Sequence, residues 1–112
     1  MSAGTYNLVV DQGSSFALDL IIKQSGAALN LTNYTGRAQL RTSHTASSAA
    51  ASFTVTKTNA SGGALKLELS PATTAGLAAG QYVYDLEIYT ASDAIVKRVL
   101  QGDLTLTPEV TR

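Results

Sequence analysis

Residues 77–89 read Leu77-Ala78-Ala79-Gly80-Gln81-Tyr82-Val83-Tyr84-Asp85-Leu86-Glu87-Ile88-Tyr89, and this stretch decides the fold. A turn of small residues ends at Gly80, and a long strand pattern follows in which apolar and polar side chains alternate. Tyr82 stands two residues after that glycine. A tyrosine at the start of such a strand can return its hydroxyl to a backbone carbonyl a few residues upstream. The stretch therefore predicts a tyrosine corner formed by Leu77, Gly80 and Tyr82.

Similar alternation predicts the other strands of the fold. The expected strands cover residues 6–10, 15–23, 36–42, 53–57, 64–70, 81–90 and 94–107. Ser70 and Pro71 are typical of a helix N-cap and a first helical residue, so we expect one or two helical turns that reach Leu77 and stop at Gly80. No predicted helix is long enough for the crossover that parallel strands need. About seven strands, one short helical turn and a tyrosine corner predict an all-β, immunoglobulin-like antiparallel β-sandwich.

Some finer details are also predicted. Tyr6, Leu8 and Val10 share one face of the first strand. The last strand is expected to bend or bulge near Gly102, because glycine inside a strand often marks such a point. Residues 43–52 are small and contain no large apolar anchor, so they predict a flexible connection. The whole chain, residues 1–112, fits one domain, since a sandwich of this type takes roughly 100 residues.

Composition narrows the class of protein. Charged residues make up 14% of the chain, against about 25% in an average soluble protein, and the formal net charge is zero. A nucleic-acid partner is not expected, because phosphate binding needs a basic stripe. With so few charges, copies of the chain repel one another little, which suits a permanent assembly better than a free monomer. The absence of cysteine excludes disulfides and thiolate metal sites.

The start of the chain, residues 1–5, lacks the basic and apolar regions of a signal peptide. The apolar runs are too short to cross a membrane, so no membrane partner is expected. Synthesis in a cytoplasm is the corresponding expectation.

The residue pattern predicts no catalytic, cofactor-binding or metal site. His44 is the sole histidine and stands in a Ser/Thr/Ala loop without a neighbouring carboxylate, so we interpret it as a solvated loop residue. Asp85 and Glu87 share one strand face, where a paired-carboxylate site is conceivable. The water-facing side of a sheet is the more frequent explanation of such a pair. The chain is therefore expected not to be an enzyme.

Arg37, Arg41 and Tyr89 are the best candidates for contact residues. The two arginines share one strand face, and Tyr89 points outward from another strand. Arginine and tyrosine are enriched where proteins bind one another. Each residue taken alone is also compatible with an ordinary exposed side chain.

Several segments together resemble a known family. The turn Asp11-Gln12-Gly13 joins two strand patterns, and Leu31-Thr32-Asn33-Tyr34-Thr35-Gly36-Arg37 follows it. In order along the chain, residues 6–16, 31–41, 80–87, 98–102 and 108–111 resemble small β-sandwich virion proteins of tailed bacteriophages. They are similar to the N-terminal module of baseplate upper proteins.

This resemblance implies a structural role in the virion, made in the host cytoplasm. The implied protein is a tail, baseplate or neck adaptor, or a capsid decoration protein, that joins other virion subunits and occurs in several symmetric copies or as a homo-oligomer. It implies no catalytic residues. A receptor- or carbohydrate-binding module is the alternative, although it would need exposed aromatic rings. A small hydrolase is a third possibility that would need clustered acids or a histidine network. The sequence leaves the virion component, the copy number and the partner open.

Overall fold

The chain folds into a β-sandwich in the computed structural model, which describes residues 4–24 and 26–110. Two sheets face each other across an apolar core, and the molecule measures 42 × 28 × 24 Å. Two segments named from the sequence include residues outside the described ranges: the start of the chain, residues 1–5, and the last segment of the family resemblance, residues 108–111. The all-β, sandwich-like fold expected from the sequence is confirmed.

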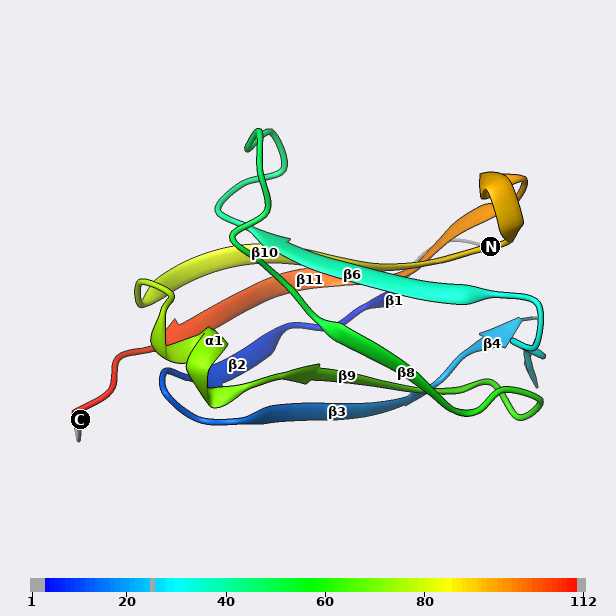
Figure 1. Ribbon diagram of the computed structural model, residues 1–112, viewed down its shortest axis with the longest axis horizontal. Helices are drawn as coiled ribbons and strands as arrows, with labels where there is room; N and C mark the ends of the chain where they lie inside the picture. The colour runs from blue at the N-terminus through cyan, green and yellow to red at the C-terminus, as the bar shows by residue number, and fades with distance from the viewer. Residues whose placement is uncertain (1–3, 25, 111–112) are drawn as a thin grey trace.

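The larger sheet contains the strand that follows the tyrosine corner, β10 (Gly80–Tyr89). Its order is β1-β11-β10-β6-β7, and β2 also pairs with β11 (Figure 1). The bounds are β1 Gly4–Thr5, β2 Leu8–Asp11, β6 Thr35–Arg41, β7 Ala51–Ser52, β10 Gly80–Tyr89 and β11 Val96–Thr107. Strand β10 lies antiparallel to both β6 and β11, whereas β1 and β2 lie parallel to β11.

The smaller sheet has the order β3-β9-β8, with all neighbours antiparallel. Its bounds are β3 Phe16–Ile21, β8 Thr54–Asn59 and β9 Ala64–Leu69, and a separate two-stranded ribbon is formed by β4 Lys23–Gln24 and β5 Ala27–Ala28. The chain crosses between the two sheets four times: β1 and β2 lie in the large sheet, β3 in the small one, β6 and β7 in the large one, β8 and β9 in the small one, and β10 and β11 in the large one. Seven described strands have four or more residues, in agreement with the number expected.

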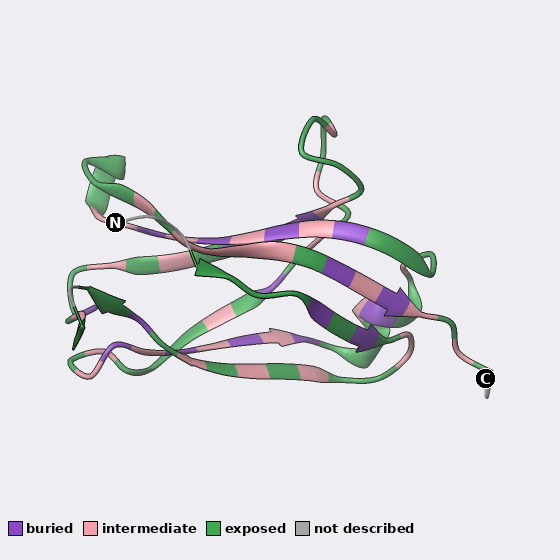
Figure 2. Cartoon of the chain, turned by 180° about the vertical axis from the view of Figure 1, so that it is seen from behind, coloured by how far each residue is buried: buried purple, intermediate pink, exposed green. Residues whose placement is uncertain are grey.

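Alternation along each strand sends one side of it into the core. On β10 and β9 every second residue is buried (Figure 2). The core side chains from these strands are Tyr82, Tyr84, Leu86, Ile88, Leu65, Leu67 and Leu69. Leu104 and Leu106 of β11 complete the large sheet's contribution. A period of two residues therefore places the apolar half of each strand between the sheets.

The tyrosine corner is present at the start of β10. The Tyr82 hydroxyl donates a hydrogen bond to the Ala78 carbonyl oxygen at 2.5 Å. Leu77 packs partly buried against the core, and its carbonyl oxygen accepts a bond from the side chain of Gln12 at 2.8 Å. Gly80 is the first residue of the strand. The acceptor is therefore one residue beyond Leu77, within the turn that the sequence singled out.

Tyr82→Phe is expected to lower the free energy of unfolding by about 1–3 kcal/mol, because the Ala78 carbonyl would lose its donor in a partly buried place. Denaturant unfolding measures this loss. Tyr89→Phe is the matched control, since the described residues offer its hydroxyl no hydrogen bond and its ring stays in place. Equal stabilities of the two variants would mean that the corner bond contributes nothing.

The first predicted strand is corrected by the structure. Strand β2 begins at Leu8 rather than at Tyr6, and Tyr6 is 51% exposed while Leu8 and Val10 are buried. Tyr6 lies in the short link between β1 and β2, where its backbone N–H donates to Gln101 at 2.9 Å. The link follows β11 without being a regular strand, so the alternation starts after it.

The last strand is bulged as predicted, but at Val99 and not at Gly102 itself. The register between β10 and β11 shifts where Leu86 faces Leu100 and Glu87 faces Arg98, so Val99 is the extra residue. Gly102 instead pairs regularly, and a Cβ atom there would lie 2.3 Å from the Tyr6 carbonyl oxygen. Glycine is needed because the backbone of the β1–β2 link passes directly over it.

The short helix begins where the sequence predicted. Helix α1 covers Pro71–Ala75, and the Ser70 hydroxyl accepts a bond from the Thr73 backbone N–H. It ends at Ala75 and is capped by Gly76, four residues before the predicted stop at Gly80. Thr74 is fully buried and donates its hydroxyl proton to the Ser14 carbonyl oxygen at 2.8 Å. This tertiary bond fixes the helix against the β2–β3 turn.

Candidate functional site

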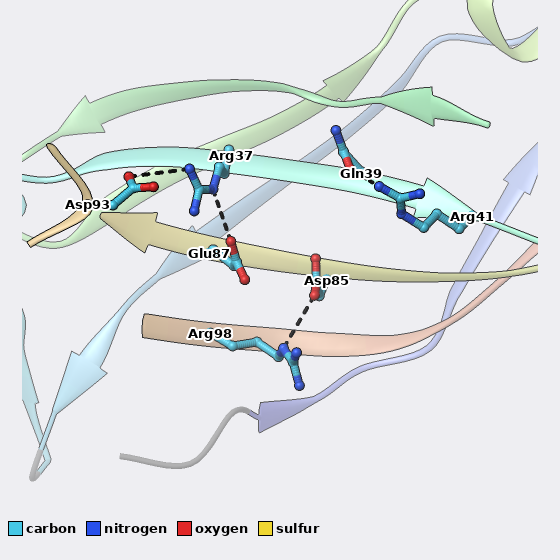
Figure 3. Close-up of polar contacts among 7 residues, drawn as sticks. All are labelled: Arg37, Gln39, Arg41, Asp85, Glu87, Asp93 and Arg98. Atoms are coloured by element: carbon cyan, nitrogen blue, oxygen red, sulfur yellow. Dashed lines mark hydrogen bonds and ion pairs between the residues drawn. The ribbon is translucent and has the colours of Figure 1, made fainter. Parts of the chain in front are cut away.

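The outward face of the large sheet carries the polar side chains that sequence analysis selected. We call this surface the outer face and define it by Arg37, Gln39, Arg41, Asp85, Glu87, Tyr89, Arg98 and Gln101. These residues alternate with core residues on three neighbouring strands, β6, β10 and β11. Figure 3 shows three arginines spread over the face, with Asp85 and Glu87 between them and Asp93 beside Arg37.

Arg37 and Tyr89 are brought together, as two of the three candidate contact residues. Cross-strand register places Arg37 opposite Glu87, whose carboxylate accepts a hydrogen bond from Arg37 Nε at 2.9 Å. Asp93 lies 3.5 Å from Arg37 Nη1. The guanidinium carbon stands 4.4 Å from the centre of the Tyr89 ring. The hydrogen bond to Glu87, followed by the charge of Asp93, raises the pKa of Arg37 above its ordinary value.

The two acidic side chains of β10, Asp85 and Glu87, each form an ion pair with an arginine. Asp85 lies 3.3 Å from Arg98 Nε on β11 (Figure 3), and Glu87 pairs with Arg37 on the other side. Their arginine partners lie on opposite neighbouring strands. The arrangement matches the water-facing side of a sheet better than a paired-carboxylate site. Exposed ion pairs of this kind contribute little to stability, typically about 0–1 kcal/mol.

Arg41, the third candidate, lies at the other end of β6 in a different environment. Its Nη1 donates to the Ala46 carbonyl oxygen and its Nη2 to the Gln39 amide oxygen, both at 3.0 Å. Within residues 4–24 and 26–110, no carboxylate pairs with it. Neutral oxygens therefore hold the guanidinium in place and leave its charge uncompensated.

A shallow hollow of about 230 Å³ opens beside Arg41. Arg98, Asp85 and His44 also line it, so its charged lining is more basic than acidic. His44 is exposed, as expected, in the segment that joins β6 to β7. The connection predicted over 43–52 is shorter than expected, because Ala51 and Ser52 pair with β6. In the described part of the chain, no three His, Cys, Asp or Glu side chains gather closely enough to hold a metal ion. No described helix has the length and hydropathy that a membrane span requires.

Two polar side chains with structural roles were missed at the sequence level. The Tyr84 hydroxyl donates to the Tyr6 carbonyl oxygen and so ties β10 to the β1–β2 link. Gln12 donates to Leu77 and accepts from the backbone N–H of Glu109 at 3.0 Å, so it connects the tyrosine corner to the end of the chain. The Asp11-Gln12-Gly13 turn was visible in the sequence, but its distant partners were not.

High pH is expected to remove stability that depends on Tyr84. Burial, and then the neighbouring Tyr6, raises the pKa of Tyr84 from 10.0 to about 12. A group whose pKa is raised on folding stabilises fully below its unfolded pKa and loses this contribution as pH rises through the folded value. Unfolding of the wild type and Tyr84→Phe between about pH 8 and about pH 12 measures the effect. The difference in free energy of unfolding between the wild type and Tyr84→Phe should fall above about pH 10. A difference that stays constant with pH would contradict the raised pKa of Tyr84.

No family model matches the sequence, and no curated protein does. Among solved structures, a family 123 glycoside hydrolase from Clostridium perfringens, described for glycolipid glycan hydrolysis, is similar at a TM-score of 0.46 and 12% identity. The match covers 96% of this chain and 24% of the enzyme. The chain thus spans about a quarter of that protein, and the likeness assigns neither family nor activity.

Proposed function

We propose that the chain is a non-enzymatic structural protein of a tailed-phage virion, which joins neighbouring subunits through the outer face. The family resemblance of the ordered sequence blocks supports the virion setting. The observation that carries the choice of surface is the stacked pair of Arg37 and Tyr89, which Glu87 and Asp93 hold in one arrangement. A contact surface whose side chains are already ordered loses less conformational entropy on binding.

Arg41 supplies the second feature of the proposed contact. Its charge has no acidic partner in the described chain, and the adjoining hollow leaves room for a side chain from outside. An acidic group of a neighbouring subunit would complete this ion pair. Charge complementarity of this kind gives specificity and register more than affinity.

The experiment is co-purification of the tagged chain with the other virion proteins of the phage genome that encodes it. The wild type should bring down one capsid, tail or neck protein. Combined Arg37→Glu and Arg41→Glu substitutions should weaken that binding at least about tenfold, because both contact cations reverse sign. Lys66→Glu, on the outer side of the small sheet, is the matched control and should bind normally.

Two results would count against the proposal. One is equal binding by the double variant and the Lys66 control, which would exclude the outer face. The other is a folded chain that binds no virion protein but binds glycans, which would favour the carbohydrate-binding alternative. That alternative has less structural support, since Arg37 covers one side of the Tyr89 ring on which a sugar would stack.

A further inference from the structure

Strand β3 leaves the edge of the small sheet open. Among the described residues it pairs with β9 on one side and with no strand on the other. The segments that precede it in the chain, β1 and β2, pair with β11 of the large sheet instead. In Figure 1, β3 is the outermost ribbon along the lower edge of the molecule. An edge strand of this kind presents backbone N–H and C=O groups that can pair with another chain.

The apolar core is also incompletely covered along β3. Its core-facing side chains, Phe16, Leu18 and Leu20, pack against the core but stay partly exposed. On the next strand, β9, the residues of the same face are at most 4% exposed; they are Leu65, Leu67 and Leu69. The core-facing side chains of β3 are therefore less covered than those of the central strand β9. A further strand beside β3 would bury this apolar surface, which is favourable.

The opposite edge strand, β8, is protected. The Lys57 ammonium on that strand donates to the Tyr34 carbonyl oxygen at 2.7 Å. Val55 packs so closely against β6 that a Cβ atom on Gly36 would lie 2.5 Å from it. Lysine on an edge and cover by a neighbouring segment are two ways in which proteins block unwanted strand pairing. Strand β3 contains neither lysine nor proline.

We propose that the open edge of β3 pairs with β3 of a second copy of this chain, antiparallel and about a twofold axis. The two three-stranded sheets would then form one continuous sheet. A twofold contact is self-complementary, so one open edge suffices to build it. This inference goes beyond the proposed function, because it concerns another surface and holds whether or not the outer face binds a virion protein.

The strand sequence selects one register. Opposed residues of antiparallel strands point to the same face, so Leu18 must face Leu18 or another core-facing residue of the second copy. Pairing centred on Leu18 places Phe16 opposite Leu20 and Ala17 opposite Asp19. Moving the centre to Asp19 opposes Asp19 to its own copy, which is unfavourable for like charges. Moving it to Ala17 leaves only residues 16–18 of β3 opposed to β3 of the second copy, so fewer strand residues pair.

The centred register also arranges the outward charges favourably. Asp19 and Ala17 are exposed and lie beside Lys66 and Glu68 of β9 respectively. Four outward side chains then lie side by side across the joined sheet. They are Glu68 and Ala17 of one copy, followed by Asp19 and Lys66 of the second copy. Ala17 separates the acidic side chains in each such row.

Sedimentation equilibrium over a range of concentrations tests this pairing with two charge variants at Ala17. The monomer has a mass of 11.6 kDa, and the wild type should approach twice that value as concentration rises. Ala17→Asp should raise the dimer dissociation constant by about 2- to 30-fold, because two like-charged cross-strand pairs form in each dimer. Ala17→Lys should keep or tighten the dimer, since it faces Asp19 of the second copy.

The same substitutions at Thr54 are the matched control. Glu68 of β9 lies between Ala17 of β3 and Thr54 of β8. A charge at Thr54 therefore acts on Glu68 as a charge at Ala17 does, but it lies away from the β3 edge. Thr54→Asp and Thr54→Lys should leave the dissociation constant unchanged. A chain that remains monomeric at every concentration would overturn the inference, and so would equal effects at the two positions. Neither result bears on binding through Arg37 and Arg41.

Discussion

Gly63→Ala is expected to lower the free energy of unfolding by about 2–5 kcal/mol. Gly63 has a φ of +75°, a conformation that side chains with a Cβ rarely adopt. A Cβ atom there would also lie 2.6 Å from the Ile22 carbonyl oxygen and 2.9 Å from that of Leu29. Both neighbours are backbone atoms, so no side-chain rotation relieves the contact.

Gly63 lies where the backbone segments around Ile22 and Leu29 meet. The Ile22 backbone N–H donates to the Gly63 carbonyl oxygen at 2.8 Å, and the Leu29 N–H donates to Ile22 at 2.8 Å. An added methyl group would push these hydrogen-bonded segments apart. Thermal or denaturant unfolding of the purified variant measures the loss.

Gly26→Ala is the matched control for this prediction. Gly26 has a φ of +80°, almost the same as that of Gly63, but an added Cβ atom would meet no atom of the described residues within 4 Å. This control should cost only the backbone strain, about 1–2 kcal/mol. If the two variants lost the same stability, close packing at Gly63 would contribute nothing.

Leu86→Ala should destabilise the sandwich by about 2–5 kcal/mol, through lost apolar burial and the cavity left behind. Leu86 is fully buried in β10, the central strand of the large sheet. Its cross-strand neighbours are Ala38 on β6 and Leu100 on β11. Alanine on one side of the site cannot fill the space that the leucine leaves.

Two controls separate the cavity from other effects of this change. Leu86→Met keeps most of the volume and should cost less than about 1.5 kcal/mol. Val83→Ala lies on the same strand but outside the core and should cost less than Leu86→Ala. Denaturant unfolding of the three variants gives the comparison. A loss for Leu86→Ala no larger than that for Val83→Ala would contradict this description of the core.

The strand pattern was predictable because its cause is local. Alternation along β9 and β10 is fixed by the geometry of an extended chain, so Leu67 and Leu86 could be placed in the core from the sequence. The N-cap Ser70 and the tyrosine corner at Tyr82 also depend on residues within four positions. Short-range signals of this type need no knowledge of the partner strand.

The error at Gly102 has a long-range cause. Glycine stands there because the distant Tyr6 backbone approaches it, which the local pattern cannot reveal. The error at the helix end has a local cause, because the C-cap residue is Gly76, which the sequence also contains, and not Gly80. The hydrogen bond from the buried Thr74 to the Ser14 carbonyl oxygen is a long-range contact of this helix that the sequence did not indicate.

The candidate site divides in the same way. Outward positions for Arg37, Arg41 and Tyr89 followed from alternation within their strands. Their pairing did not: the register between β6 and β10 sets Arg37 against Glu87 and Tyr89, and leaves Arg41 beside neutral oxygens. The sequence by itself determined which side chains face water and which face the core, because a strand repeats every two residues. Only the tertiary structure decided which of them meet and that the edge of β3 stays open, because strand order and register bring together residues far apart in the chain.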